Sequence, residues 1–489
     1  MRSRRWKAGA LTAALGLLLA LSASAASDSY WYNRGGTAVE IPDAYTLART
    51  VPLDGMAEGG LSGITDAFVA ADGRIYILDR SGVILILDDA FGQIGCIDYF
   101  YSDEAEETLS EPEGLFVDNQ GVIYVADTGN FRIVKLTQEG EVLGAYYRPD
   151  NLTGADEQLD YLPSKLAVDS AGRMFVVVRN INMGVVVLDR EGRFIAYRGA
   201  PSVKLSLYDM FWRRFSTQEQ LDRMTTYVPI EYNNLTIDAD NFLYGTISSI
   251  TDEDLTETIR ANDLSGTAAP IKKLNLAGED ILRRKGLYPP VGDLTVKSLS
   301  AFCDVALADC GIYTVLDSAK GRLFTYNDDG ELLFAFGGIG DRHDSFRKPV
   351  AVSYAGERLL VFDEELRSVF CFEETTYGGH ILGAVRRYYN GDYDAAYAEW
   401  RAVQDYNANL TLAYVGIGKA YYQDGEYGRA MECFRIAGDR ANYSMVYRKM
   451  RDNFVRRYFR YFAAGILVIA AAGVTIGSAK RFRRYIKKG

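Results

Sequence analysis

A short apolar unit recurs along the chain, and this repetition constrains the fold more than any other feature of the sequence. Each copy has an apolar strand, a turn that contains Gly or Asp, and a second apolar strand that usually ends in Asp. The copies are ITDAFVAADGRIYILD (64–79), EGLFVDNQGVIYVAD (113–127), SKLAVDSAGRMFVVV (164–178), NNLTIDADNFLYGTI (233–247), CDVALADCGIYTVLD (303–317) and VAVSYAGERLLVFD (350–363). A third strand follows each copy, and in most copies a fourth. Six such units predict an all-β, six-bladed β-propeller over residues 44–375.

The last copy ends after its third strand, so the sixth blade needs an outer strand from elsewhere. The segment AYTLARTV (44–51), near the start of the chain, is the predicted donor. Pairing the beginning of the chain with its last blade would close the ring and remove an exposed strand edge.

One stretch identifies a family resemblance. EPEGLFVDNQGVIYVADTGNFRIVKL (111–136) has Asp127, Asn130 and Arg132 in the pattern of an NHL repeat. The chain resembles the NHL-repeat propeller family over about 44–375, most closely in the second blade and least in the fourth. The resemblance implies a propeller whose relatives mostly bind proteins or other ligands on one face, and it implies a fold rather than an activity.

A second period follows the propeller. GDYDAAYAEW (391–400) aligns with GEYGRAMECF (425–434) at a shift of 34 residues. The matching positions are Tyr393 with Tyr427, Ala396 with Ala430, and Trp400 with Phe434. These residues resemble the packing positions of tetratricopeptide repeats, which predicts a small α-helical domain over 380–457. An unrelated pair of helical hairpins is the alternative.

The two ends predict the location of the protein. Residues 1–25 combine a basic start, an apolar run and Ala23-Ser24-Ala25, which is typical of a cleaved signal peptide; an uncleaved anchor is the alternative. Residues 458–479 predict a transmembrane helix, with a buried core helix as the alternative, and the basic residues 480–489 predict a cytoplasmic tail. We therefore expect a single-pass cell-membrane protein whose body is extracytoplasmic.

Charge and motif content exclude several functions. The net charge is −11 although both ends are basic, so the body is strongly acidic and should repel nucleic acid. Two histidines, His343 and His380, cannot supply a three-His zinc site, and no GxSxG, HExxH or P-loop motif occurs. Four aspartates recur at one blade position and are interpreted as structural turn partners: Asp79, Asp127, Asp317 and Asp363.

Two insertions, residues 201–231 and 249–270, should emerge on one face of the propeller, because blade connections and the loops between second and third strands share that face. Long loops on a rigid scaffold often carry function. The first insertion has helical apolar spacing that includes Tyr208 and Trp212. It either packs on the propeller or forms a lid or partner-docking helix, and these two residues are candidate ligand contacts. The C-terminal helices are expected at the opposite face.

The first strands of the blades begin at the mouth of the central channel, and five polar residues there are candidate ligand-binding residues: Asp66, Glu113, Lys165, Asn234 and Asp304. They either line the channel or form an ion or ligand site. Related six-bladed lactonases hold a divalent cation on a Glu/Asn/Asn/Asp set, so the resemblance implies Ca²⁺ as an alternative ligand. Lys165 would place a positive charge beside that ion. We therefore expect no cofactor, no metal site and no catalytic residue.

Together these features predict a membrane-anchored extracytoplasmic binding or scaffold protein rather than an enzyme. Its propeller face would bind a protein or glycan, as an accessory to a membrane transporter. The alternative is a metal-dependent hydrolase similar to the gluconolactonase-type lactonases.

Overall fold

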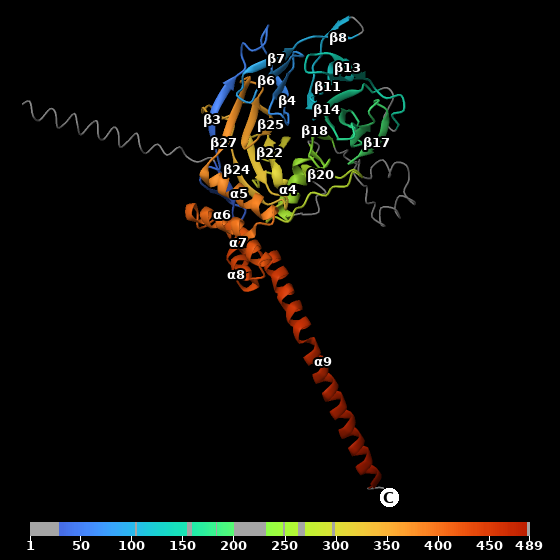
Figure 1. Cartoon of the computed structure of the whole chain (residues 1–489), viewed down its shortest axis with the longest axis vertical. Helices are drawn as coiled ribbons and strands as arrows, with labels where there is room; N and C mark the ends of the chain where they lie inside the picture. Colours follow the sequence, from blue (N-terminus) through green and yellow to red (C-terminus); the bar gives the residue numbers. More distant parts are fainter. Residues whose placement is uncertain are drawn as a thin grey trace, which may run out of the picture. The chain divides into compact units, whose positions relative to one another are not determined.

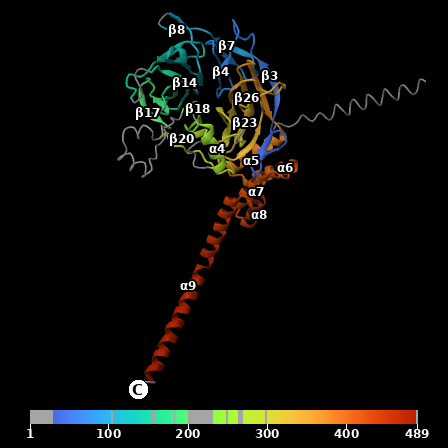
Figure 2. The ribbon, with the colours of Figure 1, turned by 180° about the vertical axis from the view of Figure 1, so that it is seen from behind.

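The computed structural model describes residues 29–102, 105–153, 159–181, 183–199, 231–247, 250–262, 269–295 and 299–486. Six antiparallel sheets follow one another in this part of the chain, and their first strands contact one another in a ring (Figures 1 and 2). The predicted six-bladed β-propeller is confirmed.

Blades 1 to 3 each have four strands that follow chain order from the channel outward. Blade 1 is β4 (Ile64–Val69), β5 (Ile75–Asp79), β6 (Ile84–Leu87) and β7 (Gln93–Ile97). Blade 2 is β10 (Gly114–Val117), β11 (Ile123–Asp127), β12 (Arg132–Leu136) and β13 (Val142–Tyr146). Blade 3 is β14 (Leu162–Val168), β15 (Met174–Arg179), β16 (Val185–Leu188) and β17 (Phe194–Arg198).

Blades 4 to 6 depart from this pattern. Blade 4 has three strands, β18 (Tyr232–Ile237), β19 (Leu243–Ile247) and β20 (Ile271–Leu274). Blade 5 is β21 (Phe302–Leu307), β22 (Tyr313–Asp317), β23 (Arg322–Tyr326) and β24 (Leu332–Phe336). Blade 6 is β25 (Pro349–Ala355), β26 (Arg358–Asp363), β27 (Ser368–Glu374) and β3 (Tyr45–Pro52).

The inner strands are continuous apolar runs because neighbouring blades cover both of their faces. Every residue of β5 and β6 is buried, whereas the outer strand β7 is mostly exposed. A short, wholly buried run bounded by turn residues is what such a position requires. The turn residue Gly73 has φ +87°, a conformation that favours glycine.

The ring closes as predicted. Strand β3 pairs with β27 in an antiparallel register that runs from Tyr45 opposite Glu374 to Pro52 opposite Ser368. The chain leaves β27 directly into α5 (Thr376–Tyr389). At Gly378 a Cβ atom would lie 2.0 Å from the carbonyl oxygen of Ala44, so only glycine permits this approach.

Several elements were not predicted. A hairpin of β1 (Tyr30–Tyr32) and β2 (Ala38–Glu40) extends the outer edge of blade 5 by pairing with β24. A second hairpin, β8 (Phe100–Ser102) and β9 (Ala105–Glu107), precedes blade 2. The second insertion contains α4 (Asp252–Ala261). In blade 4 the expected fourth strand is reduced to a single bridge between Leu274 and Asp280.

The chain divides into two compact units, residues 1–382 and 383–489. The second contains α6 (Tyr393–Tyr406), α7 (Thr411–Gln423), α8 (Tyr427–Ala437) and α9 (Arg440–Ile486). The helices lie where the 34-residue period placed them, and Trp400 and Phe434 are buried as expected. Their assignment to tetratricopeptide repeats stays a prediction.

By length and composition, α9 is the one helix in the described part of the chain that could cross a membrane. The predicted signal peptide (1–25) and the residues Tyr208 and Trp212 lie outside the described residues. Those assignments stay predictions. The expectation that the insertions and the C-terminal helices occupy opposite faces also stays a prediction.

Candidate functional site

The first strand of each blade contributes one residue at an equivalent position facing the channel. We call this set the channel ring, and its members are Asp66, Gly114, Lys165, Asn234, Asp304 and Ala351. In every blade except the second, the pairing register shifts immediately before this residue. The shift interrupts the regular alternation of side chains between the two faces of the sheet. Four of the five predicted channel residues therefore belong to the ring.

Glu113 does not belong to the ring and precedes the ring position by one residue, so its role as a ligand contact stays a prediction. Gly114 occupies the position in blade 2, because the neighbouring strand β14 passes very close. A Cβ atom at Gly114 would lie 2.5 Å from the carbonyl oxygen of Ser164 and 2.9 Å from the Cα atom of Lys165. No side chain fits there, and Glu113 is instead directed into a cavity described below.

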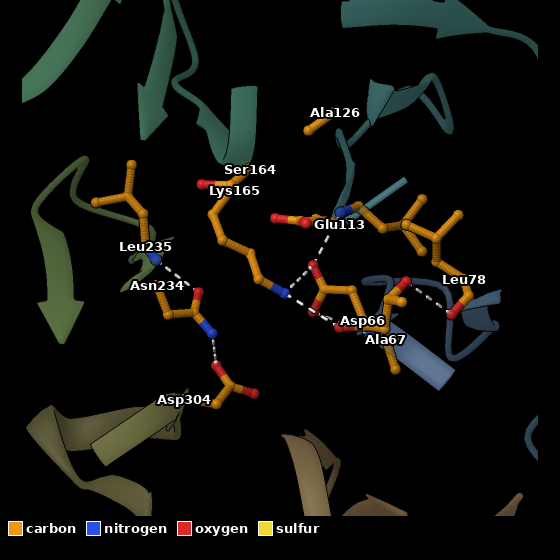
Figure 3. A network of polar contacts seen from close by, with 12 residues as sticks. Asp66, Ala67, Leu78, Glu113, Ala126, Ser164, Lys165, Asn234, Leu235 and Asp304 are labelled. Carbon is orange, nitrogen blue, oxygen red and sulfur yellow. Dashed lines mark hydrogen bonds and ion pairs between the residues drawn. The ribbon is translucent and has the colours of Figure 1, made fainter. Parts of the chain in front are cut away.

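Within the ring, Asp66 and Lys165 form a buried ion pair (Figure 3). The Lys165 Nζ atom lies 3.0 Å from Asp66 Oδ2, and the two side chains are only 13% and 10% exposed. Asp66 also accepts hydrogen bonds from the backbone N–H groups of Ala67 (3.0 Å) and Leu115 (2.9 Å). The carboxylate thus joins blade 1 to blade 2, while the lysine neutralises it from blade 3.

On the other side of the channel, Asp304 joins blades 4, 5 and 6. It accepts hydrogen bonds from the Asn234 Nδ2 atom (2.6 Å), from the N–H of Val305 (2.7 Å) and from the N–H of Val352 (2.6 Å). Asn234 in turn accepts from the N–H of Leu235 at 2.5 Å. Burial and the nearby charge of Asp66 raise the pKa of Asp304 to about 7, although Lys165 and the N–H groups oppose the shift.

These contacts do not fit a metal ion. The carboxylate oxygens of Asp66 and Asp304 and the amide oxygen of Asn234 already accept hydrogen bonds. An ammonium group lies where a Ca²⁺ ion would need further oxygen ligands. Among the described residues, no group of three or more His, Cys, Asp or Glu side chains is arranged to hold a metal.

A cavity of about 770 Å³ lies at the mouth of the channel. We call it the mouth cavity. Loops between second and third strands supply Arg80 and Glu364, the end of β15 supplies Arg179, and connections between blades supply Glu113 and Glu231. All of these loops lie on one face of the propeller, since the strands of each blade alternate in direction. The two insertions predicted that function lies on this face, but only Glu113 and Lys165 among the lining residues were predicted site residues.

Charged side chains in the mouth cavity are paired but remain accessible to solvent. Arg179 lies 2.7 Å from Glu113, with exposed fractions of 58% and 24%, and Arg80 lies 2.7 Å from Glu364, with 53% and 15%. Burial raises the pKa of Glu113, while the positive charge of Arg179 opposes that shift. Neither arginine could be predicted as a site residue, because each is a single charge near the end of a strand with no motif around it.

The recurring blade aspartates are structural, as predicted. Asp79 accepts hydrogen bonds from the N–H groups of Ser62, Gly63 and Ser81. Asp363 similarly accepts from those of Arg347, Lys348 and Leu366. Each of these carboxylates satisfies the backbone of the loops at its own blade.

Comparisons with known proteins agree with this fold. The family model described as NHL repeat matches residues 109–136, which cover the first three strands of blade 2. The six-bladed propeller thus contains an NHL repeat in its second blade, and helices follow it. A search of curated proteins found no match.

Solved structures with a similar fold include a virginiamycin B lyase from Staphylococcus aureus, with 10% identity and a TM-score of 0.41 over 68% of this chain and 100% of that one. A streptogramin B lyase has 12% identity and a TM-score of 0.40, again over 68% and 100%. U3-55K has 9% identity and a TM-score of 0.38 over 66% and 79%. At these TM-scores the similarities carry no argument about fold or function.

Proposed function

We propose that this protein is a membrane-anchored extracytoplasmic binding protein whose mouth cavity docks a protein or glycan partner, as an accessory to a membrane transporter. One observation carries the proposal: the cavity is lined by solvent-accessible ion pairs, whereas the channel beneath it is internally satisfied. Exposed pairs can exchange partners with an incoming ligand at little cost.

The charged residues at the mouth fit a partner that has both positive and negative charges on its surface. Arg80 and Arg179 present guanidinium groups that can form two parallel hydrogen bonds to a carboxylate. Glu113 and Glu364 present carboxylates beside them. A protein surface offers such mixed charge more readily than a neutral glycan does, so a protein is the preferred partner.

The location in the proposal comes from the ends of the chain. The apolar, exposed segment of α9 supports a membrane span, and the export signal predicted over residues 1–25 supports an extracytoplasmic propeller. The helices between the propeller and this segment would be available to a membrane protein.

A lactonase-like hydrolase is the second candidate. One observation favours it: Glu113 is a carboxyl group with a raised pKa in a sizeable cavity, which suits a general base. The satisfied oxygens of the channel ring disfavour a catalytic metal there. Lactone hydrolysis that depends on a divalent cation and is lost in Glu113→Gln would favour this candidate over binding.

Cross-linking on intact cells, followed by affinity capture of the full chain and mass spectrometry, tests the proposal. We expect one membrane complex to be recovered reproducibly, and its recovery to fall at least about tenfold in Arg179→Glu, since reversing a charge inserts repulsion into the contact.

Arg193→Glu is the matched control. It makes the same change in the same blade, on a side chain that is 70% exposed, but in the turn between the third and fourth strands on the opposite face. Equal capture by both variants, or no partner above background, would contradict the proposal.

A further inference from the structure

The opposite end of the channel has a cavity of its own, of about 710 Å³. We call it the opposite cavity. Turns between the first and second strands of blades 1 to 4 form its rim, for example Asp118–Gln120 in blade 2 and Asp169–Ser170 in blade 3. Its volume lies within the range of small-molecule sites. No residue of the mouth cavity lines it.

Aromatic rings form one wall of the opposite cavity. The ring centroids of Phe68 and Phe116 are 5.0 Å apart, and those of Phe116 and Tyr124 are 6.5 Å apart. Tyr146 continues this wall toward blade 3. Phe68 and Tyr146 are only half-buried, so part of their surface is open to a ligand.

Two cations line the same cavity without a carboxylate partner. No carboxylate of the described residues forms an ion pair with Lys135 or Arg190. The Lys135 Nζ atom lies 5.2 Å from the centroid of the Tyr124 ring. Arg190 donates through Nε to the carbonyl oxygen of Ala171, which leaves its terminal nitrogens available.

The local structure holds Arg190 in place. Its side chain lies against Gly172, where a Cβ atom would come within 2.8 Å of Nε and 3.0 Å of Cγ. The hydroxyl group of Tyr146 donates to the Arg190 carbonyl oxygen at 3.2 Å. A cation held at the cavity wall by one hydrogen bond, with its terminal nitrogens unused, can bind an anion.

The carboxylates in the lining are already used by their own turns. Asp118 accepts from the N–H groups of Gln120 and Val122, and from the Tyr124 hydroxyl. Asp169 and Asp238 each accept two turn N–H groups in the same way, and they also pair with Arg173 and Lys273. Asp118 is the one described lining carboxylate without a cation partner, so two unpaired cations, Lys135 and Arg190, face one unpaired carboxylate, a net of one positive charge.

We propose that the opposite cavity binds a carboxylate-bearing sugar, such as a uronic-acid oligosaccharide. The aromatic wall offers flat surfaces to the C–H face of a sugar ring. Lys135 and Arg190 bind the carboxylates, and the side chains of Asn119, Gln120 and Ser170 lie on the rim as partners for hydroxyl groups. This site is on the other face from the mouth cavity, so it goes beyond the proposed docking function.

Isothermal titration of the full-length protein in detergent micelles with trigalacturonate tests this inference, with maltotriose as the neutral probe. We expect binding of the acidic sugar and none of the neutral one. Lys135→Met and Arg190→Gln should each weaken binding by about tenfold or more, since each removes a charge-assisted contact. Arg193→Gln, which alters the same turn as Arg190 but lies outside the cavity, should bind as the unmodified protein does.

Thermal unfolding of each variant verifies that it is folded, and Lys135→Arg, which retains the charge, should bind measurably. Equal binding of both sugars, no binding, or binding that survives both charge-removing variants would overturn the inference. Tighter binding of tetraglutamate than of trigalacturonate would also overturn it, because the site would then recognise an acidic peptide. Any of these results leaves the capture experiment on the mouth cavity unaffected.

Discussion

The channel ring and the mouth cavity contain the same kinds of side chain and lie next to each other, yet they differ in access to water. The Lys165–Asp66 pair is 13% and 10% exposed, whereas the Arg179–Glu113 pair is 58% and 24% exposed. A buried pair whose partners also hold backbone groups is costly to disturb, while an exposed pair contributes little to stability. In this propeller, access to water separates the charges that hold blades together from the charges that can contact a ligand.

Removing a ring carboxylate should have the largest effect. Asp304→Ala takes the acceptor from Asn234 and from the N–H groups of Val305 and Val352. Leaving such groups buried and unpaired should lower the free energy of unfolding by about 3–5 kcal/mol. Thermal unfolding of the detergent-solubilised chain, followed by circular dichroism, measures the loss. An unchanged midpoint would mean that the ring is not structural.

The pH dependence of stability should also come from the ring. The pKa of Asp304 is raised to about 7 in the folded protein, above its ordinary value of 3.8, so the folded state binds the proton more tightly. The contribution of Asp304 to the free energy of unfolding is therefore fully present below about pH 4 and is lost as the pH rises through 7. This change is on the order of a few kcal/mol.

Unfolding midpoints between pH 4.5 and 7.5 measure this effect. In Asp304→Asn, most of the decrease in midpoint with rising pH should disappear, whereas in Glu113→Gln most of this decrease should remain. A decline of equal size in the unmodified protein and in Asp304→Asn would show that other groups cause it.

The same neutralising change at the mouth should affect stability far less. Glu113→Gln removes one partner of an exposed pair, so we expect the free energy of unfolding to change by less than about 1 kcal/mol. The measurement is the thermal unfolding used for Asp304→Ala. A loss as large as that of Asp304→Ala would erase the distinction between the two regions.

Calcium should have the smallest effect. Because the ring oxygens are occupied and Lys165 lies among them, we expect neither binding heat nor a shift in midpoint when Ca²⁺ is added at millimolar concentration. Calorimetry on the full chain measures this, with Mg²⁺ as the reference ion. A heat of binding that disappears in Asp66→Asn would locate a metal site in the ring after all.

Much of the fold could be predicted because local signals repeat. Turn residues such as Gly73 and Gly121 mark each blade, and the segment at 44–51 was recognisable as a strand without a partner. The absence of a fourth strand in blade 4 could not be predicted, because it depends on how residues 275–281 turn back on β20. The β1–β2 hairpin was missed because its short strands carry no repeat pattern.

The candidate site was harder to predict than the fold. Each ring residue from Asp66 to Asp304 precedes its turn residue by seven positions, and this spacing already favoured Gly114 over Glu113 in blade 2. The pairing of Arg179 with Glu113 joins the end of β15 in blade 3 to the connection before blade 2, so no local pattern could reveal it. Burial, which decides the role of each charge, is a property of the closed ring.

The position of β27 has a mechanical consequence. The chain runs from this strand into α5 and on to α9, so any pull on the C-terminal end reaches the propeller through β27. The strand has hydrogen-bonded neighbours on both sides, β26 and β3, and β3 comes from the opposite end of the chain. Removing β27 from the blade therefore requires breaking the hydrogen bonds of two ladders. Strand β3, which completes the ring, thus also stabilises β27, the strand that connects the propeller to the C-terminal helices.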